Sequence, residues 1–208
     1  MSEAAVETPV ETIDVSGLPD HAFGSRSILW WATVGIIAIE ATVFVVAIAA
    51  YYYLQANEEM WPPAGVALPG LFWPTLNTAI LFVSCIPNHF LKKAAEDKDL
   101  RKIRIWIVIA DLFAVVFTVI RGYEYTTIGG SWDLNAFTSM TWTLLSLHSF
   151  HVVTDLLDTL VLTALVFTHH GEEPKRMVDV SENCFYWYFV VLAWIPIYLV
   201  LYWSPRWL

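Results

Sequence analysis

Long apolar stretches, separated by short polar segments, divide the chain. The first runs from residue 27 to 54 and exceeds the roughly 20 residues that an α-helix needs to cross a bilayer. Four more follow, at about 71–92, 101–124, 137–168 and 181–203. None alternates between apolar and polar positions as the strands of a membrane barrel do. The pattern predicts an all-α fold, an integral membrane bundle of five transmembrane helices.

The composition favours the same class. Of the 208 residues, 57% are hydrophobic and only 15% are charged, too few to cover the surface of a soluble domain of this length. The length fits one domain. Residues 1–26 are polar and acidic, and we expect them to form an N-terminal tail, without a cleaved signal peptide, ahead of a five-helix domain at 27–208. The net charge of -9 argues against nucleic acid as a partner.

Basic residues predict the orientation in the membrane. Most of them lie at Arg26, between the second and third helices, and between the fourth and fifth. With five spans these regions share one side, which the positive-inside rule makes cytoplasmic. The N-terminus is then cytoplasmic and the C-terminus outside. Tryptophan and tyrosine residues cluster at the helix ends, and we expect an interfacial belt that includes Tyr51, Trp61 and Tyr202.

Carboxyl groups at membrane depth are the first candidate functional residues. Glu40 lies near the middle of the first apolar run and Asp111 in the middle of the third. A charged group at that depth is costly, so both are expected to face other helices, water or a partner protein. Arg121 and Glu124 are three residues apart on the third helix and are predicted to pair, a contact worth about 0.2–0.5 kcal/mol if exposed. Asn77 gives the second helix a polar patch for helix packing.

A polar stripe on the fourth helix is the second candidate. Steps of three and four residues put six positions on one face, namely Thr141, Leu144, His148, His151, Asp155 and Asp158. The favoured interpretation is a buried, hydrogen-bonded seam against a neighbouring helix. A proton path is an alternative. A metal site with His148, His151 and Asp155 as ligands is the third interpretation, and it is the weakest because no second helix offers histidine at membrane depth.

Several short motifs occur in one order along the chain. They are Glu40 within 39–44, Trp61-Pro62-Pro63 with Gly65, Leu76-Asn77-Thr78, Tyr123-Glu124, His148 and His151 with Val152, and Tyr186-Trp187-x-Phe189 followed by Trp194. Together they resemble subunit III of the haem–copper oxidases, the superfamily of cytochrome c oxidases and quinol oxidases. The likeness covers about residues 25–205. The five-helix length is similar to the short bacterial members, which lack the first two helices of the longer form.

Four positions depart from the family's pattern. The glycine between the two motif histidines is Ser149, and a following glycine is replaced at Asp155. The histidine and aspartate of the last motif are Tyr188 and Val191. These departures indicate a divergent branch, such as one serving a nitric oxide reductase or an unusual oxidase.

The resemblance implies a role without redox chemistry in this chain. Subunit III of the family binds no haem or copper, which lie in the partner subunits. It packs mainly on subunit I, in a complex that also holds subunit II, binds membrane phospholipid, and supports proton uptake and stable turnover. From the polar positions at membrane depth we assign this support, or else a structural role, to Glu40, Asp111, His148, His151, Asp155 and Asp158. We expect no catalytic, cofactor-binding or metal-binding residue in this chain.

The leading interpretation is therefore an accessory subunit of a proton-pumping cytochrome c oxidase, which reduces O2 to water, in the inner membrane of a bacterial cell. One alternative is the same subunit of a quinol oxidase or a nitric oxide reductase. A second alternative, from a different class, is a stand-alone membrane transporter. The sequence shows no inverted repeat of the kind that many transporters have, which argues against it.

Overall fold

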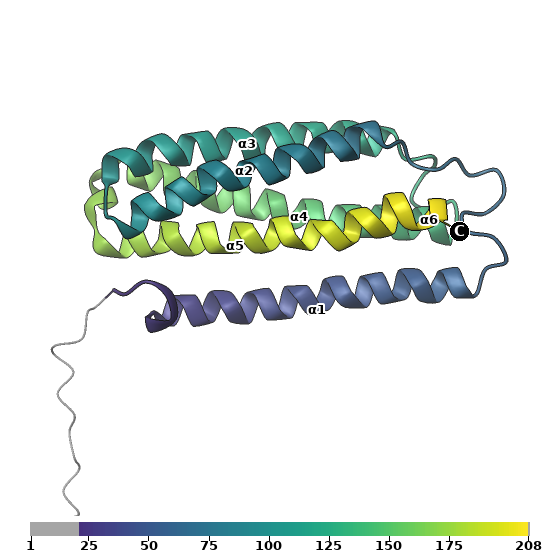
Figure 1. Ribbon diagram of the computed structural model, residues 1–208, viewed down its shortest axis with the longest axis horizontal. Coiled ribbons are helices and arrows are strands. Elements are labelled where there is room, and N and C mark those ends of the chain that lie inside the picture. Colours follow the sequence, from purple (N-terminus) through teal and green to yellow (C-terminus); the bar gives the residue numbers. More distant parts are fainter. Residues whose placement is uncertain (1–20, 208) are drawn as a thin grey trace, which may run out of the picture.

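The computed structural model describes residues 21–207, and all regular structure in this part of the chain is helical (Figure 1). The long helices are α1 (Ile28–Ala56), α2 (Phe72–Glu96), α3 (Leu100–Thr126), α4 (Ala136–Val166) and α5 (Pro174–Tyr198). The helix α5 continues through a π-helical turn, Leu199–Trp203, into the short α6 (Ser204–Trp207). The predicted all-α class is confirmed. Residues 1–20 of the predicted tail lie outside the described residues.

Polar side chains and one proline determine where the helices begin. The side chains of Ser27, Asp99 and Asn135 each accept a hydrogen bond from a backbone amide in the first turn of α1, α3 and α4, respectively. The helix α5 begins at Pro174, so the predicted start at 181 is wrong. Proline suits the first helical position, because its missing N–H has no partner to lose there and its fixed φ fits a helix.

The helices α2 to α5 form a bundle, and α1 lies along one side of it (Figure 1). Within the bundle α2 packs on α3 and α5, and α4 packs on the same two helices. The main contacts of α1 are with α4 and α5. Side chains from several of these helices, including Phe44, Phe117, Leu145 and Trp194, fill one continuous core. Because α5 contacts α1, α2 and α4, polar groups on its inner face can reach partners on three helices.

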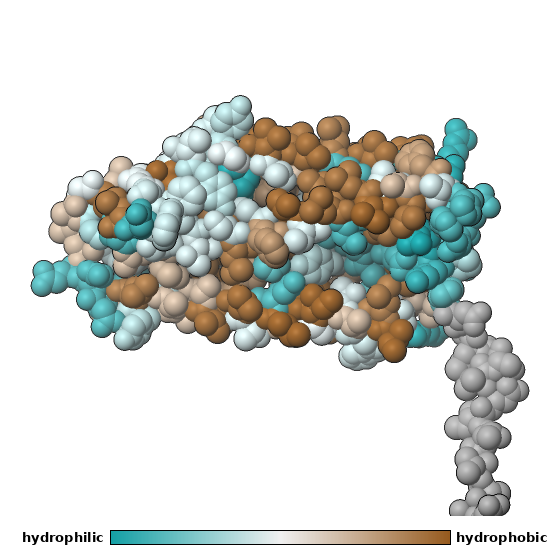
Figure 2. All heavy atoms as spheres, turned by 180° about the vertical axis from the view of Figure 1, so that it is seen from behind, coloured by the Kyte–Doolittle hydropathy of each residue, from teal (hydrophilic) through white to brown (hydrophobic). Residues whose placement is uncertain are grey.

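Among the described residues, four helices are long and apolar enough to cross a membrane, namely α1, α3, α4 and the α5 segment extended to Trp207. Apolar residues cover much of the middle of the molecule, and hydrophilic residues gather toward its two ends (Figure 2). The helix α2 is less apolar because it carries Asn77, Ser84 and Asn88, all of which are buried. Four of the five predicted spans are therefore supported by length and composition, and α2 is the one that is not.

The predicted aromatic belt is wrong at three positions, Tyr51, Trp61 and Tyr202. Trp31 and Trp207 are exposed near the helix ends, as expected. Tyr51 and Tyr202 are instead completely buried, and Trp61 is 8% exposed. The indole Nε1 of Trp61 donates to the hydroxyl of Tyr51 at 2.8 Å. These aromatic residues belong to the core rather than to the interface.

Candidate functional site

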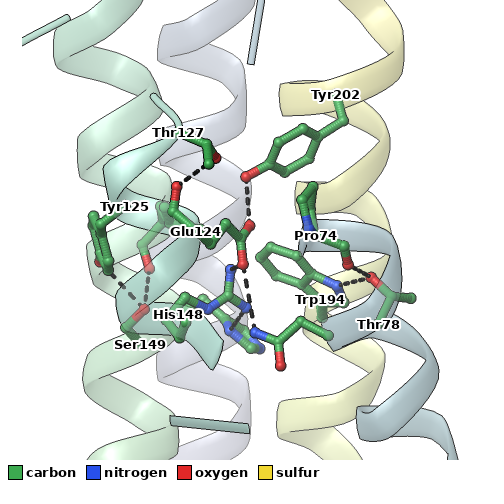
Figure 3. Close-up of polar contacts among 12 residues, drawn as sticks. Pro74, Thr78, Glu124, Tyr125, Thr127, His148, Ser149, Trp194 and Tyr202 are labelled. Atoms are coloured by element: carbon green, nitrogen blue, oxygen red, sulfur yellow. Dashed lines mark hydrogen bonds and ion pairs between the residues drawn. The ribbon is translucent and has the colours of Figure 1, made fainter. Parts of the chain in front are cut away.

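Glu124 of α3 belongs to a buried ion pair, and Figure 3 shows its side chain among those of Tyr202, Trp194 and His148. The guanidinium Nη1 of Arg121 donates to Glu124 Oε2 at 2.8 Å, and the two side chains are 3% and 0% exposed. The predicted pairing is confirmed, but the pair is buried rather than exposed. The hydroxyl of Tyr202, from the π-helical turn, donates to the other carboxylate oxygen. Asn77 Nδ2 on α2 donates to Oε2 at 3.4 Å, so three helix segments converge on one carboxylate.

His148 and Trp194 enclose the charged end of Arg121. The guanidinium carbon lies 4.0 Å from the ring centroid of Trp194, a cation–π contact. His148 Nε2 lies 3.1 Å from the carbonyl oxygen of Val190, and Nδ1 lies 3.5 Å from Arg121 Nη2. A carbonyl only accepts and a guanidinium only donates, so a neutral ring with its proton on Nε2 satisfies both neighbours. His148 therefore joins α3, α4 and α5 as part of a seam.

Glu40 is held by two elements that lie far from it in the sequence. The hydroxyl of Tyr186 on α5 donates to Glu40 Oε2 at 2.7 Å. His151 Nε2 on α4 lies 3.7 Å from Glu40 Oε1, while its Nδ1 is 2.6 Å from the carbonyl oxygen of Leu147. The Glu40 side chain remains 25% exposed. The expectation that Glu40 faces other helices is confirmed, because both contacts come from the neighbouring helices of α1.

The part of the α4 stripe nearer the C-terminal end of α4 contacts α5 through one amide. Asn183 Nδ2 donates to Asp155 Oδ1 and to Asp158 Oδ2, both at 3.3 Å, and Asn183 Oδ1 accepts from Thr159 at 3.1 Å. Asp155 is 5% exposed. Asp158, which was predicted to share the buried face, is exposed. Thr159 takes the buried position there, since Asp158 lies at the edge of a stripe that drifts around the helix.

The other stripe positions fit a seam. Thr141 and Leu144 are both completely buried, and Thr141 bonds within α4 to the carbonyl oxygen of Phe137 at 2.8 Å. Asp111 is 7% exposed, and its Oδ2 accepts from Thr163 of α4 at 2.7 Å. The hydrogen bonds thus support the seam interpretation. A proton-linked role for these residues stays a prediction.

The described residues contain no group of three or more histidine, cysteine, aspartate or glutamate side chains that could hold a metal ion. In the arrangement seen here, His148 and His151 point to different partners, a carbonyl and a carboxylate. The metal interpretation of the stripe gains no support from this geometry.

The remaining motif residues stabilise the contacts between helices. Trp187 Nε1 donates to Ser84 Oγ on α2 at 2.9 Å, and Trp194 Nε1 donates to Thr78 Oγ1 at 2.7 Å. Phe189 lies beside Phe44 of α1, with ring centroids 6.3 Å apart. The two prolines of the loop between α1 and α2, Pro62 and Pro63, follow the buried Trp61. At the departing positions, Val191 is buried in the core and Tyr188 is partly buried.

Comparison with known proteins assigns this architecture to a family. The family model described as cytochrome c oxidase subunit III matches residues 15–206, nearly the whole chain. The chain belongs to the cytochrome c oxidase subunit III family. As a subunit III it is part of an oxidase complex, an oxidoreductase with other subunits, and it is a multi-pass membrane protein.

Individual relatives agree with the family match. Cytochrome c oxidase subunit 3 of Thermostichus vulcanus is 30% identical over 88% of this chain and 90% of its own length. The protein of the same name from Synechocystis is 24% identical over 97% of this chain and 87% of its own length. The subunit 3 of Podospora anserina is 26% identical over 89% of this chain and only 71% of its own length, so it is the longer protein. The sequence resemblance to subunit III is confirmed.

Sequence reasoning missed several partners of this subunit III site. Tyr202 was assigned to the interfacial belt, and Asn183 and Thr163 were not considered. Asn183 could have been found, because an amide at membrane depth needs a hydrogen-bonding partner and helix 4 offers two carboxyl groups. Tyr202 carried no comparable signal, since tyrosine near a helix end is ordinary at a membrane interface.

Proposed function

We propose that the chain is a non-redox accessory subunit III of a proton-pumping haem–copper terminal oxidase that takes electrons from cytochrome c and reduces O2 to water. The observation that carries this proposal is the family membership over residues 15–206. The haem and copper of such an enzyme lie in its partner subunits. The relatives named above are all called cytochrome c oxidase subunits, which favours cytochrome c as the donor over quinol and an oxidase over a nitric oxide reductase.

In this proposal the chain crosses a bacterial inner membrane five times, with α2 as the fifth span. The basic residues support the orientation, since most of them lie in the last turns of α2, in the first turns of α3 and in the first turn of α5, which would share one side of the membrane. The N-terminus is then cytoplasmic and the C-terminus outside. Burial of Asn77, Ser84 and Asn88 supports α2 as a span, because its polar groups do not face lipid.

The proposed partners are subunit I, as the main contact, then subunit II and membrane phospholipids. Apolar side chains remain exposed along α1 and α3, as expected for faces that meet lipid or a partner helix. A phospholipid is proposed to lie beside α1, where that helix meets α4 and α5. The support for proton uptake is assigned to Glu40 with the His151, Asp155 and Asp158 positions of α4, and to Asp111 on α3.

The test is purification of the assembled enzyme from its own membranes. The chain carries a C-terminal tag, the membranes are solubilised in mild detergent, and the product is analysed by reduced-minus-oxidised spectroscopy and mass spectrometry. We expect a stoichiometric haem-bearing subunit I and a copper-bearing subunit II. A well-folded but colourless chain that purifies alone and transports a solute would overturn the proposal in favour of a stand-alone transporter.

A further inference from the structure

The connection between α2 and α3 forms a basic corner at one end of the bundle. Residues 92–104, which we call the α2–α3 corner, contain six cationic and three acidic side chains. Two of the cations are paired within it, Lys92 with Glu96 at 3.1 Å and Lys102 with Asp99 at 2.9 Å. The corner therefore keeps a surplus of positive charge.

Three exposed cations carry most of that surplus, namely Lys93, Lys98 and Arg101. None of them forms an ion pair with another residue that the structure describes. The remaining cation, Arg104, donates its Nε to the carbonyl oxygen of Val166 at 3.0 Å. Lys93, Lys98 and Arg101 are thus available to an acidic partner.

Lys98 stands at a backbone position that ordinarily suits glycine. Its φ is 57°, in the left-handed region, and its amide closes the end of α2 by donating to the carbonyl oxygen of Ala95 at 3.1 Å. Glycine is the usual residue at such a helix end, because it has no Cβ to strain the backbone. The backbone therefore holds a charged side chain at the point where the two helices meet.

The chain ahead of α1 is fastened to the same end of the bundle. Phe23 packs against a core cluster from the last turns of α2, the first turns of α3 and the start of α5, which includes Leu91, Ile103 and Met177. The short turn Gly24–Arg26 joins Phe23 to α1. Figure 1 shows α1 beginning at the end of the bundle where α2 passes into α3. The described chain therefore begins at the end that carries the α2–α3 corner, whichever side of the membrane that end faces.

Residues 1–20, which we call the N-terminal segment, are complementary to the corner in charge. They contain no lysine or arginine and five acidic residues, namely Glu3, Glu7, Glu11, Asp14 and Asp20. The seven residues from Asp14 to His21 can extend to roughly 23 Å, more than twice the distance of about 8–10 Å between packed helix axes. The carboxylates from Asp14 toward the N-terminus can therefore reach across the end of the bundle.

The other charged surface at this end disfavours the segment. Asp158, Asp179 and Glu182 line the cleft between α1, α4 and α5, and Leu29 in the first turn of α1 lines it too. Like charge repels the segment from this cleft and leaves the α2–α3 corner as the favourable surface. Exposed ion pairs are individually weak, but a covalently attached partner has an effective concentration on the order of millimolar.

We propose that the α2–α3 corner is the docking surface of the chain's own N-terminal segment, whose carboxylates pair with Lys93, Lys98 and Arg101. The family match begins at residue 15, so most of this segment lies ahead of the part that the family model describes. The docking is therefore a property of this chain that goes beyond the proposed function.

The experiment joins carboxylates and amines that touch. The purified complex, in nanodiscs of phosphatidylcholine, is treated with a carbodiimide, which forms an amide between a carboxylate and a lysine amine with loss of one water, and the products are identified by mass spectrometry. We expect links from the N-terminal segment to Lys93 and Lys98. They should decrease about fivefold when the salt is raised from about 0.1 M to about 1 M, because the Debye length falls from about 10 Å to about 3 Å.

Asp99 and Lys102, 2.9 Å apart, are the internal control and should be linked in the low-salt sample. Links from the segment only to Lys175 or to a partner subunit would overturn the proposal, and so would the absence of links to the corner beside a normal control link. The same reaction in phosphatidylglycerol nanodiscs tests the competing occupant. Links that persist support the proposal, whereas links that disappear would assign the corner to anionic headgroups and overturn it.

A triple variant, Lys93→Gln with Lys98→Gln and Arg101→Gln, gives an independent readout. Glutamyl endopeptidase cleaves after the glutamates of the N-terminal segment. At equal ionic strength we expect cleavage to be about fivefold faster in the variant, the factor that a few exposed ion pairs supply. Lys175→Gln makes the same change at another exposed position and should leave the rate unchanged. Equal rates in the triple variant and the wild type would contradict the docking, whereas a wild-type chain without haem-bearing partners counts against the proposed function only.

Discussion

Arg121 and Glu124 form an ion pair of 2.8 Å that is almost entirely removed from the surface of the chain. Because both charges are buried, each needs hydrogen-bonding or cation–π partners from the neighbouring helices. The carboxylate also accepts from Tyr202 and Asn77, and the guanidinium lies against Trp194. A buried pair offsets its desolvation only when further hydrogen bonds satisfy both partners, and these contacts supply them.

Replacement of Glu124 by Gln is the first prediction. It leaves Arg121 charged and unpaired in the interior, so we expect a loss of about 3–5 kcal/mol of stability. The measurement is the denaturation midpoint and melting temperature of the purified complex. The double variant Arg121→Met with Glu124→Leu removes both charges and should be less destabilised than Glu124→Gln. If the double variant is the less stable of the two, the pair stabilises the fold in some other way.

The hydrogen bond from Trp194 Nε1 to Thr78 Oγ1, 2.7 Å long, gives the second prediction. A double-mutant cycle of Trp194→Phe and Thr78→Val should yield a coupling of about 1 kcal/mol, because each single change removes the same bond. The control cycle combines Trp194→Phe with Thr33→Val on α1, which shares no partner with Trp194 and should be additive within about 0.3–0.5 kcal/mol. Additivity in the first cycle would mean that the bond contributes nothing.

The start of α3 gives a prediction about pH. Asp99 caps this helix by accepting from the Lys102 amide at 3.1 Å, and it also pairs with the Lys102 ammonium at 2.9 Å. The hydrogen bond from the Lys102 side chain is the main reason that the pKa of Asp99 lies below its ordinary value of 3.8. A lowered pKa in the folded state means that the stabilisation is present above the ordinary value and is lost as the pH falls through the lowered one.

The melting temperature of the wild-type protein is therefore compared with that of Asp99→Asn as a function of pH. The difference should be small and constant at neutral pH and should shrink once the pH falls below about 3.8, the ordinary value. The asparagine variant keeps an N-cap acceptor, so it isolates the charge from the cap. A difference that grows with acidity contradicts the prediction.

Replacement of Glu40 by Ala tests the proposed functional role. Tyr186 and His151 lose their shared partner, but Glu40 is partly exposed, so we expect the complex to assemble with a normal haem spectrum. We expect it to lose activity sooner during continuous turnover, because Glu40 is assigned to support proton uptake. Unchanged inactivation kinetics in this variant would remove that role from Glu40. The control is Tyr198→Phe, at the end of α5 away from Glu40. It removes the hydroxyl contact between Tyr198 and Thr75 of α2 and should leave the inactivation kinetics unchanged.

The sequence was sufficient for the helices and for much of the polar interior. The long apolar runs predicted each helix, because backbone groups in lipid must be satisfied within the helix itself. The placement of Glu40 and Asp111 against other helices followed from the cost of a carboxyl group at membrane depth. The buried positions of His148, His151 and Asp155 followed from helical periodicity, although periodicity alone could not name the helix that each would meet.

Other features depend on geometry that a regular helical pattern does not contain. On a regular α-helix Tyr202 would lie about 80° around the axis from the buried Trp194, at the edge of the face of α5 that packs into the bundle. The π-helical turn at Leu199–Trp203, which follows Pro196, changes that angle and brings Tyr202 to Glu124. The predicted burial of Asp158 was wrong for a related reason. A stripe with steps of three and four residues drifts relative to a helix of 3.6 residues per turn, so its last position lies outside the buried face.

The central claim, that this chain sustains an oxidase without carrying out its redox chemistry, is tested most directly by O2 consumption. The purified enzyme is compared with the same enzyme from which this chain has been removed, with cytochrome c as donor, over prolonged turnover. The account predicts the same haem spectrum and a similar initial rate in both samples, with activity lost much sooner in the depleted one. An initial rate that disappears with the chain, or an unchanged working life without it, would contradict the account.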